Sequence, residues 1–84
     1  MGEGRLKYVY ILKSVNFPDA HYVGATIDLR KRFRDHNAGA SPHTRKFRPW
    51  ALVTYLAFED HAKADAFEHY LKSASGRAFA KRHF

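Results

Sequence analysis

Two short runs of β-branched and aromatic residues near the start of the chain most constrain what it can fold into. The first is KYVYILK, Lys7–Lys13, and the second is HYVGA, His21–Ala25. Both have the composition of β-strands. The short segment between them contains Asn16, Pro18 and Asp19, which favour a loop. Because the connection is short, the sequence predicts an antiparallel hairpin.

A helix is predicted directly after this hairpin. Thr26 or Asp28 can cap the start of a helix over Leu29–Ala38, and Gly39 can end it. The segment that follows, GASPHTRKFRPW, is basic and contains two prolines, so we expect a long loop.

The second half of the chain supplies a third strand and more helix. ALVTYLAF, residues 51–58, has the strongest strand composition in the sequence. Asp60 can cap a second helix over about His61–Ser73, and SASGR separates it from a short closing helix. We therefore predict an α+β domain, with a small three-stranded antiparallel sheet flanked by helices in the order β-β-α-β-α-α.

The chain has 84 residues, which is close to the lower limit for a self-sufficient core. A hydrophobic fraction of 45% is enough for that core, and without cysteine there are no disulfides or thiolate metal sites. No apolar run approaches the ~20 residues that span a bilayer, and the start, MGEGRLK, lacks the apolar stretch of a signal peptide. We expect a single domain over residues 1–84, with its core at about 7–82, in the cytoplasm and without a membrane partner.

The basic charge is unevenly distributed along the chain. The net charge is +7, from 15 Lys and Arg against 8 Asp and Glu. Arg30–Arg48 holds seven basic residues and one acid, and Lys72–Phe84 holds four basic residues and no acid. Glu59–Glu68, in contrast, holds four acids and one lysine. Such segregation favours a face that binds a polyanion, most often nucleic acid, although solubility alone also explains a positive charge.

Helical geometry puts two polar residues beside the buried face of the first predicted helix. Leu29 and Phe33 define that face, and Arg32 and His36 lie next to it at positions i and i+4. Arg32 could equally be a side chain that extends from the core margin to solvent, and His36 a hydrogen-bonded histidine at the core edge. The other basic residues of this helix point toward solvent: Arg30, Lys31 and Arg34.

In the second predicted helix, Ala64, Phe67, Leu71 and Ala74 form the inward stripe, and Glu68 lies at its border. A solvated helix glutamate is the simpler interpretation of Glu68. Without cysteine or a His-x-x-x-His pair on one helix, a structural zinc site is not expected. A hard cation such as Mg²⁺ could instead bind one carboxylate together with phosphate oxygens of a substrate, and Glu68 would suit that role.

Several segments together resemble a known family. VYI, Val9–Ile11, and YVG, Tyr22–Gly24, resemble the two halves of the GIY-YIG motif. The resemblance continues in order through TIDLRKRFRDHN, HTRKFRPWALVTYLAFED and ADAFEHYLKSASGR, over roughly residues 7–82. The chain is similar to the small stand-alone bacterial members of this nuclease superfamily, grouped with excinuclease C-type domains.

The chain departs from the family pattern at three positions. Val9 replaces a glycine, Val23 replaces an isoleucine, and Ala74 stands where relatives often have glycine. None of the three removes a residue with a chemical role. The extra segments with which other members select a DNA sequence do not fit into a chain of this length.

The resemblance implies a divalent-metal-dependent endonuclease that hydrolyses phosphodiester bonds. Its catalytic residues would be Tyr10, Tyr22, Arg32, His36 and Glu68. Glu68 would hold one Mg²⁺ or Mn²⁺, and Arg32 would stabilise charge on the phosphoryl oxygens. We expect Tyr10 to be the base, with His36 accepting its proton, and Tyr22 to be a hydroxyl donor, although the two tyrosines could exchange roles.

The expected substrate is DNA, with RNA left open, cut in a structure-selective or weakly sequence-specific way, as in DNA repair. Two alternatives remain: a non-catalytic nucleic-acid-binding module, and a nuclease subunit that is active only with a partner protein that supplies specificity. Trp50 could stack on a base, although a core position suits it better. The side chains expected to contact flanking phosphates are Arg30, Lys31, Arg34, Arg45, Lys46 and Arg48.

Overall fold

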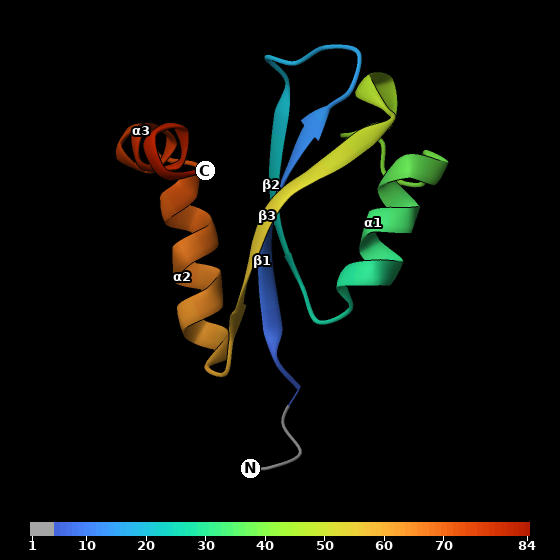
Figure 1. Ribbon diagram of the computed structural model, residues 1–84. Helices are drawn as coiled ribbons and strands as arrows, with labels where there is room; N and C mark the ends of the chain where they lie inside the picture. Colours follow the sequence, from blue (N-terminus) through green and yellow to red (C-terminus); the bar gives the residue numbers. More distant parts are fainter. Residues whose placement is uncertain (1–4) are drawn as a thin grey trace.

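The computed structural model describes residues 5–84 and shows a three-stranded antiparallel sheet between helices (Figure 1). The α+β fold and the predicted order of elements are confirmed. A 3-10 turn, Arg45–Phe47, lies in the long loop before the third strand. The strands are β1 (Lys7–Ser14), β2 (His21–Thr26) and β3 (Trp50–Phe58), and the helices are α1 (Leu29–Ala38), α2 (His61–Leu71) and α3 (Ala74–His83).

Strand β1 is the centre of the sheet, which has the order β2-β1-β3. Tyr10 pairs with Gly24, and Leu12 pairs with Tyr22. Successive side chains of a strand point to opposite faces, so β1 contributes Val9 and Ile11 to one face and Tyr10 and Leu12 to the other. All four are buried because helices cover both faces.

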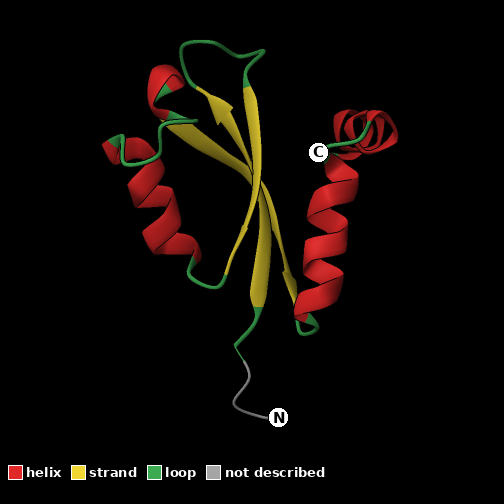
Figure 2. Cartoon of the chain, turned by 180° about the vertical axis from the view of Figure 1, so that it is seen from behind, coloured by secondary structure: helices red, strands yellow, loops and turns green. Residues whose placement is uncertain are grey.

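The two faces of the sheet have separate cores. Val9 and Ile11 pack with Ala64 and Leu71 of α2. On the opposite face, Tyr10, Leu12 and Trp50 form the second core, against which Leu29 and Phe33 of α1 pack. Figure 2 shows α1 on one side of the sheet and α2 with α3 on the other.

The predicted helix caps are confirmed. The carboxylate of Asp28 accepts a hydrogen bond from the backbone N–H of Lys31, 3.1 Å away, at the start of α1. Gly39 ends this helix with φ of 81°, a left-handed conformation that favours glycine. Asp60 caps α2 in the same way, accepting from Ala62 and Lys63. These caps set the residue at which each helix begins, and therefore which of its residues face the sheet.

One sequence-based assignment is wrong at the end of α2. Ala74 does not belong to the inward stripe of that helix: it is exposed and lies in the first turn of α3. The reason is Ser73, whose hydroxyl accepts from Gly76 N–H and begins a new helix. The two helices meet closely, since a Cβ at Gly76 would lie 2.6 Å from Leu71 Cα. No helix within residues 5–84 is both long and apolar enough to cross a membrane.

Candidate active site

The candidate site begins where Tyr10 crosses the neighbouring strand. Its cross-strand partner is Gly24, and a Cβ at that position would lie 2.6 Å from Tyr10 Cζ and 3.0 Å from Tyr22 Cε2. Gly24 therefore leaves the space in which the Tyr10 ring lies over β2. The centroids of the Tyr10 and Tyr22 rings are 6.3 Å apart.

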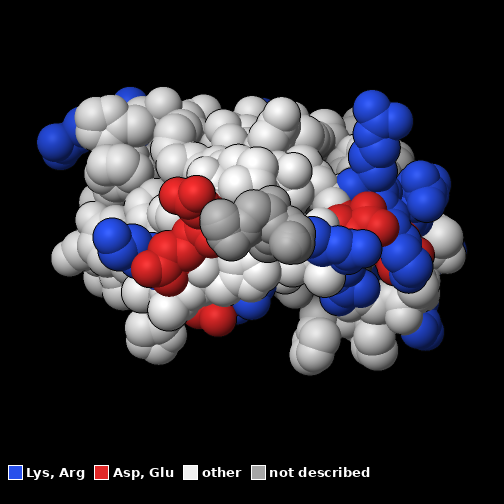
Figure 3. All heavy atoms as spheres, turned by 90° about the horizontal axis from the view of Figure 1, so that it is seen from below, with Lys and Arg blue, Asp and Glu red and all other residues white. Residues whose placement is uncertain are grey.

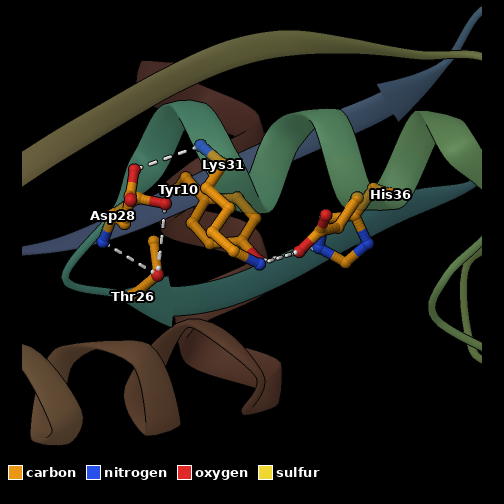
Figure 4. Close-up of polar contacts among 6 residues, drawn as sticks. Tyr10, Thr26, Asp28, Lys31 and His36 are labelled. Carbon is orange, nitrogen blue, oxygen red and sulfur yellow. Dashed lines mark hydrogen bonds and ion pairs between the residues drawn. The ribbon is translucent and has the colours of Figure 1, made fainter.

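His36 connects Tyr10 to the loop that follows α1. The Oη of Tyr10 lies 2.8 Å from His36 Nε2 (Figure 4). Nδ1 of the same imidazole lies 2.7 Å from Thr44 Oγ1. Tyr10 is 1% exposed, and His36 and Thr44 are fully buried. The carbonyl of Thr44 accepts a hydrogen bond from Trp50 Nε1 at 2.9 Å. The three side chains form one hydrogen-bonded chain, held by the core residue Trp50.

Burial sets the protonation of this chain. The pKa of Tyr10 is raised to about 12, chiefly by burial and then by Tyr22, although Arg32 acts in the opposite direction. The pKa of His36 is lowered, again chiefly by burial and then by the positive charge of Arg32. At neutral pH Tyr10 therefore keeps its proton and His36 is neutral. A neutral imidazole can accept a proton, which the pair requires if it is to act as a base.

The remaining two predicted catalytic residues approach Tyr10 from different helices. Arg32, half-buried, lies on α1 one turn before His36, and its charge lowers the pKa of both Tyr10 and His36. Glu68 lies on α2, and its charge contributes to raising the pKa of Tyr10. The structure thus brings Tyr10, Tyr22 and His36 into one aromatic cluster, and brings the charges of Arg32 and Glu68 within electrostatic reach of Tyr10.

Glu68 is the predicted metal ligand, and its present partner is a lysine. Its side chain is 21% exposed, and a carboxylate oxygen lies 2.6 Å from Nζ of Lys72, one turn later. Within residues 5–84, no three His, Cys, Asp or Glu residues form a cluster that could hold a metal ion. The donor set is a single carboxylate, which fits Mg²⁺ or Mn²⁺ completed by water and substrate phosphate, and does not fit zinc.

The six basic residues predicted to contact phosphates are all exposed, and they lie on α1 and around the 3-10 turn. Two of them have partners: Lys31 pairs with Asp35 at 3.0 Å, and Arg45 donates to the carbonyl of Gly39. Seen from below, Lys and Arg side chains gather on the side of the molecule where α1 lies, with acids among them (Figure 3). Trp50 is buried, so it belongs to the core and is not free to stack on a base.

Two residues that contact the candidate site, Thr44 and Lys72, were not identified from the sequence. Thr44 lies in a loop, and a loop threonine gives no periodic signal that would reveal its contact with His36. Lys72 was counted only as part of the basic C-terminal segment. Its spacing of i+4 from Glu68 is the signal that could have indicated the ion pair.

The family model of the GIY-YIG catalytic domain matches residues 6–82. The chain therefore belongs to the GIY-YIG family, as the sequence motifs predicted.

The relatives fall into two groups. A structure-specific endonuclease subunit SLX1 of Candida dubliniensis is 40% identical over 73 residues, covering 79% of this chain and 26% of the relative. A UPF0213 protein of Haloquadratum walsbyi is 37% identical, covering 79% of this chain and 73% of the relative. A UPF0213 protein of Clostridium perfringens is 38% identical, covering 80% of this chain and 71% of the relative. The chain thus spans about a quarter of the length of the SLX1 subunit and most of the length of the UPF0213 proteins.

Proposed function

We propose that this GIY-YIG domain is a divalent-metal-dependent endonuclease that hydrolyses phosphodiester bonds in DNA and selects its substrate by structure. The observation that carries the proposal is the hydrogen-bonded chain from Tyr10 through His36 to Thr44, next to the charges of Arg32 and Glu68. A matching SLX1 relative is named a structure-specific endonuclease subunit, which supports selection by structure.

The proposed base is the pair of Tyr10 and His36. A tyrosine with a pKa of about 12 does not accumulate as phenolate at neutral pH. Its Oη can nevertheless take a proton from the attacking water while its own proton passes to His36 Nε2, 2.8 Å away. The imidazolium that results donates from Nε2 to Tyr10 and from Nδ1 to Thr44 Oγ1. The proton is thereby stored on His36, and Tyr10 conducts it.

The other proposed catalytic residues act on the phosphate. Arg32 stabilises negative charge that grows on the phosphoryl oxygens. Tyr22, the more exposed of the two tyrosines, donates its hydroxyl to the phosphate or to the attacking water. Glu68 would hold Mg²⁺ or Mn²⁺, and the cation would supply Lewis-acid stabilisation of the phosphate and of the leaving oxygen. Lys72, which pairs with the same carboxylate, would compete with the cation.

A second candidate is favoured by the relatives' names. Several relatives are named as subunits of an endonuclease, and this chain covers only part of their length. The same site could therefore cut only when a partner protein presents the DNA. The two candidates predict the same chemistry and differ in whether the purified chain is active alone.

The decisive experiment measures cleavage of labelled branched, flapped, single-stranded and duplex DNA in Mg²⁺, in Mn²⁺ and in chelator. We expect cleavage that requires metal and depends on substrate structure, and expect Glu68→Gln to abolish it. The matched control is Asp65→Asn, a neutralised exposed acid on the same helix, which should cut normally. Cleavage in chelator, or by Glu68→Gln at the wild-type rate, would refute the proposed metal role.

A further inference from the structure

A groove of about 830 Å³ opens on the side of the sheet that α2 and α3 cover. Strands β1 and β2 form one wall, and α3 with the end of α2 forms the other. Tyr22 is part of its lining, and so is Lys72, the ion-pair partner of Glu68. The groove therefore reaches the candidate active site at the Lys72–Glu68 pair, whereas the ring of Tyr22 packs with Tyr10 and His36 on the opposite face of the sheet.

The charge of the lining favours an anion. Its basic residues include Lys13, Lys72, Arg77 and Lys81, against a single acid, Asp19. Within residues 5–84 the lysines that form ion pairs are Lys7, Lys31 and Lys72. Lys13, Arg77 and Lys81 therefore have no carboxylate partner among these residues. An excess of cations along a groove, most of them without a carboxylate partner, is typical of a phosphate-binding path.

The groove also has an apolar and aromatic component. Leu71 and Phe84 contribute to the lining, and Phe84 is 43% exposed. Arg77, Ala80 and Lys81 of α3 and Phe84, which follows the helix directly, line the groove at the spacing of one helix face. That face thus presents cations beside an exposed aromatic ring.

We propose that this groove binds a single-stranded stretch of nucleic acid next to the phosphodiester bond that is cut. Unpaired bases can stack on aromatic rings while their phosphates contact Lys and Arg, which is the combination found in the groove. A duplex keeps its base faces stacked on each other, so it could use only the cations. The inference rests on the proposed nuclease function and extends it, since it names the part of a branched substrate that the domain recognises.

The experiment measures binding, in chelator, of a fluorescent single-stranded oligonucleotide and of the blunt duplex of the same sequence. Lys81→Ala should weaken single-strand binding and lower the slope of log affinity against log salt by about 0.7. Its matched control is Arg82→Ala, the same charge change at the next position of α3, outside the groove lining. Phe84→Ala should weaken single-strand binding by about tenfold and leave duplex binding unchanged.

Two results would overturn the inference. One is equal weakening by Lys81→Ala and Arg82→Ala, which would mean diffuse attraction to a basic surface. The other is an equal effect of Phe84→Ala on single strand and duplex. Because chelator prevents metal-dependent cleavage, these outcomes do not depend on catalysis. An inactive protein that still shows the predicted binding would contradict the nuclease proposal alone, and an active protein without that binding would contradict only the groove.

Discussion

The phenol oxygen of Tyr10 lies 2.8 Å from Nε2 of His36, and both side chains are shielded from solvent. The two residues are 26 positions apart in the chain, on β1 and α1. Their contact depends on Gly24, since any larger residue there would occupy the space of the Tyr10 ring. The glycine of the second half-motif therefore has a packing role that serves the tyrosine of the first.

Cleavage should depend on pH through His36. Because burial lowers the pKa of His36 below its usual 6.5, the imidazole is neutral at neutral pH and becomes charged only in acid. A charged imidazole cannot accept the proton from Tyr10, so the rate should be flat near neutral pH and fall in acid, with a midpoint below 6.5. Single-turnover cleavage at saturating enzyme measures this profile.

The Tyr10→Phe variant tests the same contact. Removing the hydroxyl should reduce the rate by about 10²-fold or more, the usual scale for a positioned acid–base group. Tyr22→Phe is the comparison, and its loss should be smaller because a donor mainly orients. If both phenylalanine variants cut as fast as the wild type, the tyrosines only stabilise the hairpin.

Tyr10 should also make stability depend on pH in alkali. Its pKa is raised from 10.0 to about 12 in the folded protein. The unfolded chain loses this proton first, so the stabilisation is complete below pH 10 and is lost as pH rises toward 12. A shift of this size corresponds to roughly 2–3 kcal/mol. Denaturant unfolding of wild type and Tyr10→Phe at pH 9 to 12 isolates the effect, since the variant should lack this part of the decline. Equal declines in both proteins would contradict it.

Thr44 should be needed both for the stability of the fold and for the pKa of His36. Thr44→Val keeps the shape of the side chain but removes the partner of His36 Nδ1, 2.7 Å away. A buried polar atom left without a partner costs about 1–3 kcal/mol. Thr44→Ser keeps the hydroxyl and is the matched control. We expect a lower free energy of unfolding and slower cleavage for Thr44→Val, with Thr44→Ser close to wild type in rate. NMR titration of His36 separates the two roles, because a purely structural residue would leave its pKa unchanged.

Local signals in the sequence were sufficient for most of the fold. The β-branched runs at the N-terminus predicted β1 and β2, and the caps Asp28 and Asp60 fixed where α1 and α2 begin. A cap works through hydrogen bonds to the next few residues, so it can be identified without tertiary information. The end of α2 was misplaced because Ser73 caps a new helix, which a continuous apolar spacing through Ala74 concealed.

The candidate site was only partly predictable. The spacing of Arg32 and His36 on one helix face could be derived from helical geometry, whereas their chemical roles were supplied by the resemblance to a family. The sequence left open whether His36 was merely a residue at the core edge, and the structure buries it completely. Thr44 was missed because its contact with His36 joins a helix to an irregular loop, and no periodicity describes such a pair.

Lys72 should compete with the metal ion for Glu68. Its Nζ lies 2.6 Å from the carboxylate, and the lysine also lines the basic groove. A cation at Glu68 would share the carboxylate with Lys72 and be repelled by its ammonium group, so Lys72→Met should bind Mn²⁺ more tightly than wild type. The gain should not exceed about fivefold, because an ion pair with a half-exposed lysine contributes at most about 1 kcal/mol. Calorimetric titration with Mn²⁺ measures this gain, with Lys63→Met as the control for loss of charge and Glu68→Gln as the variant that should not bind.

A single-stranded oligonucleotide in the groove should draw Lys72 toward its phosphates and raise the Mn²⁺ affinity of wild type more than that of Lys72→Met. Weaker Mn²⁺ binding by Lys72→Met would instead mean that the lysine holds Glu68 in position for the metal.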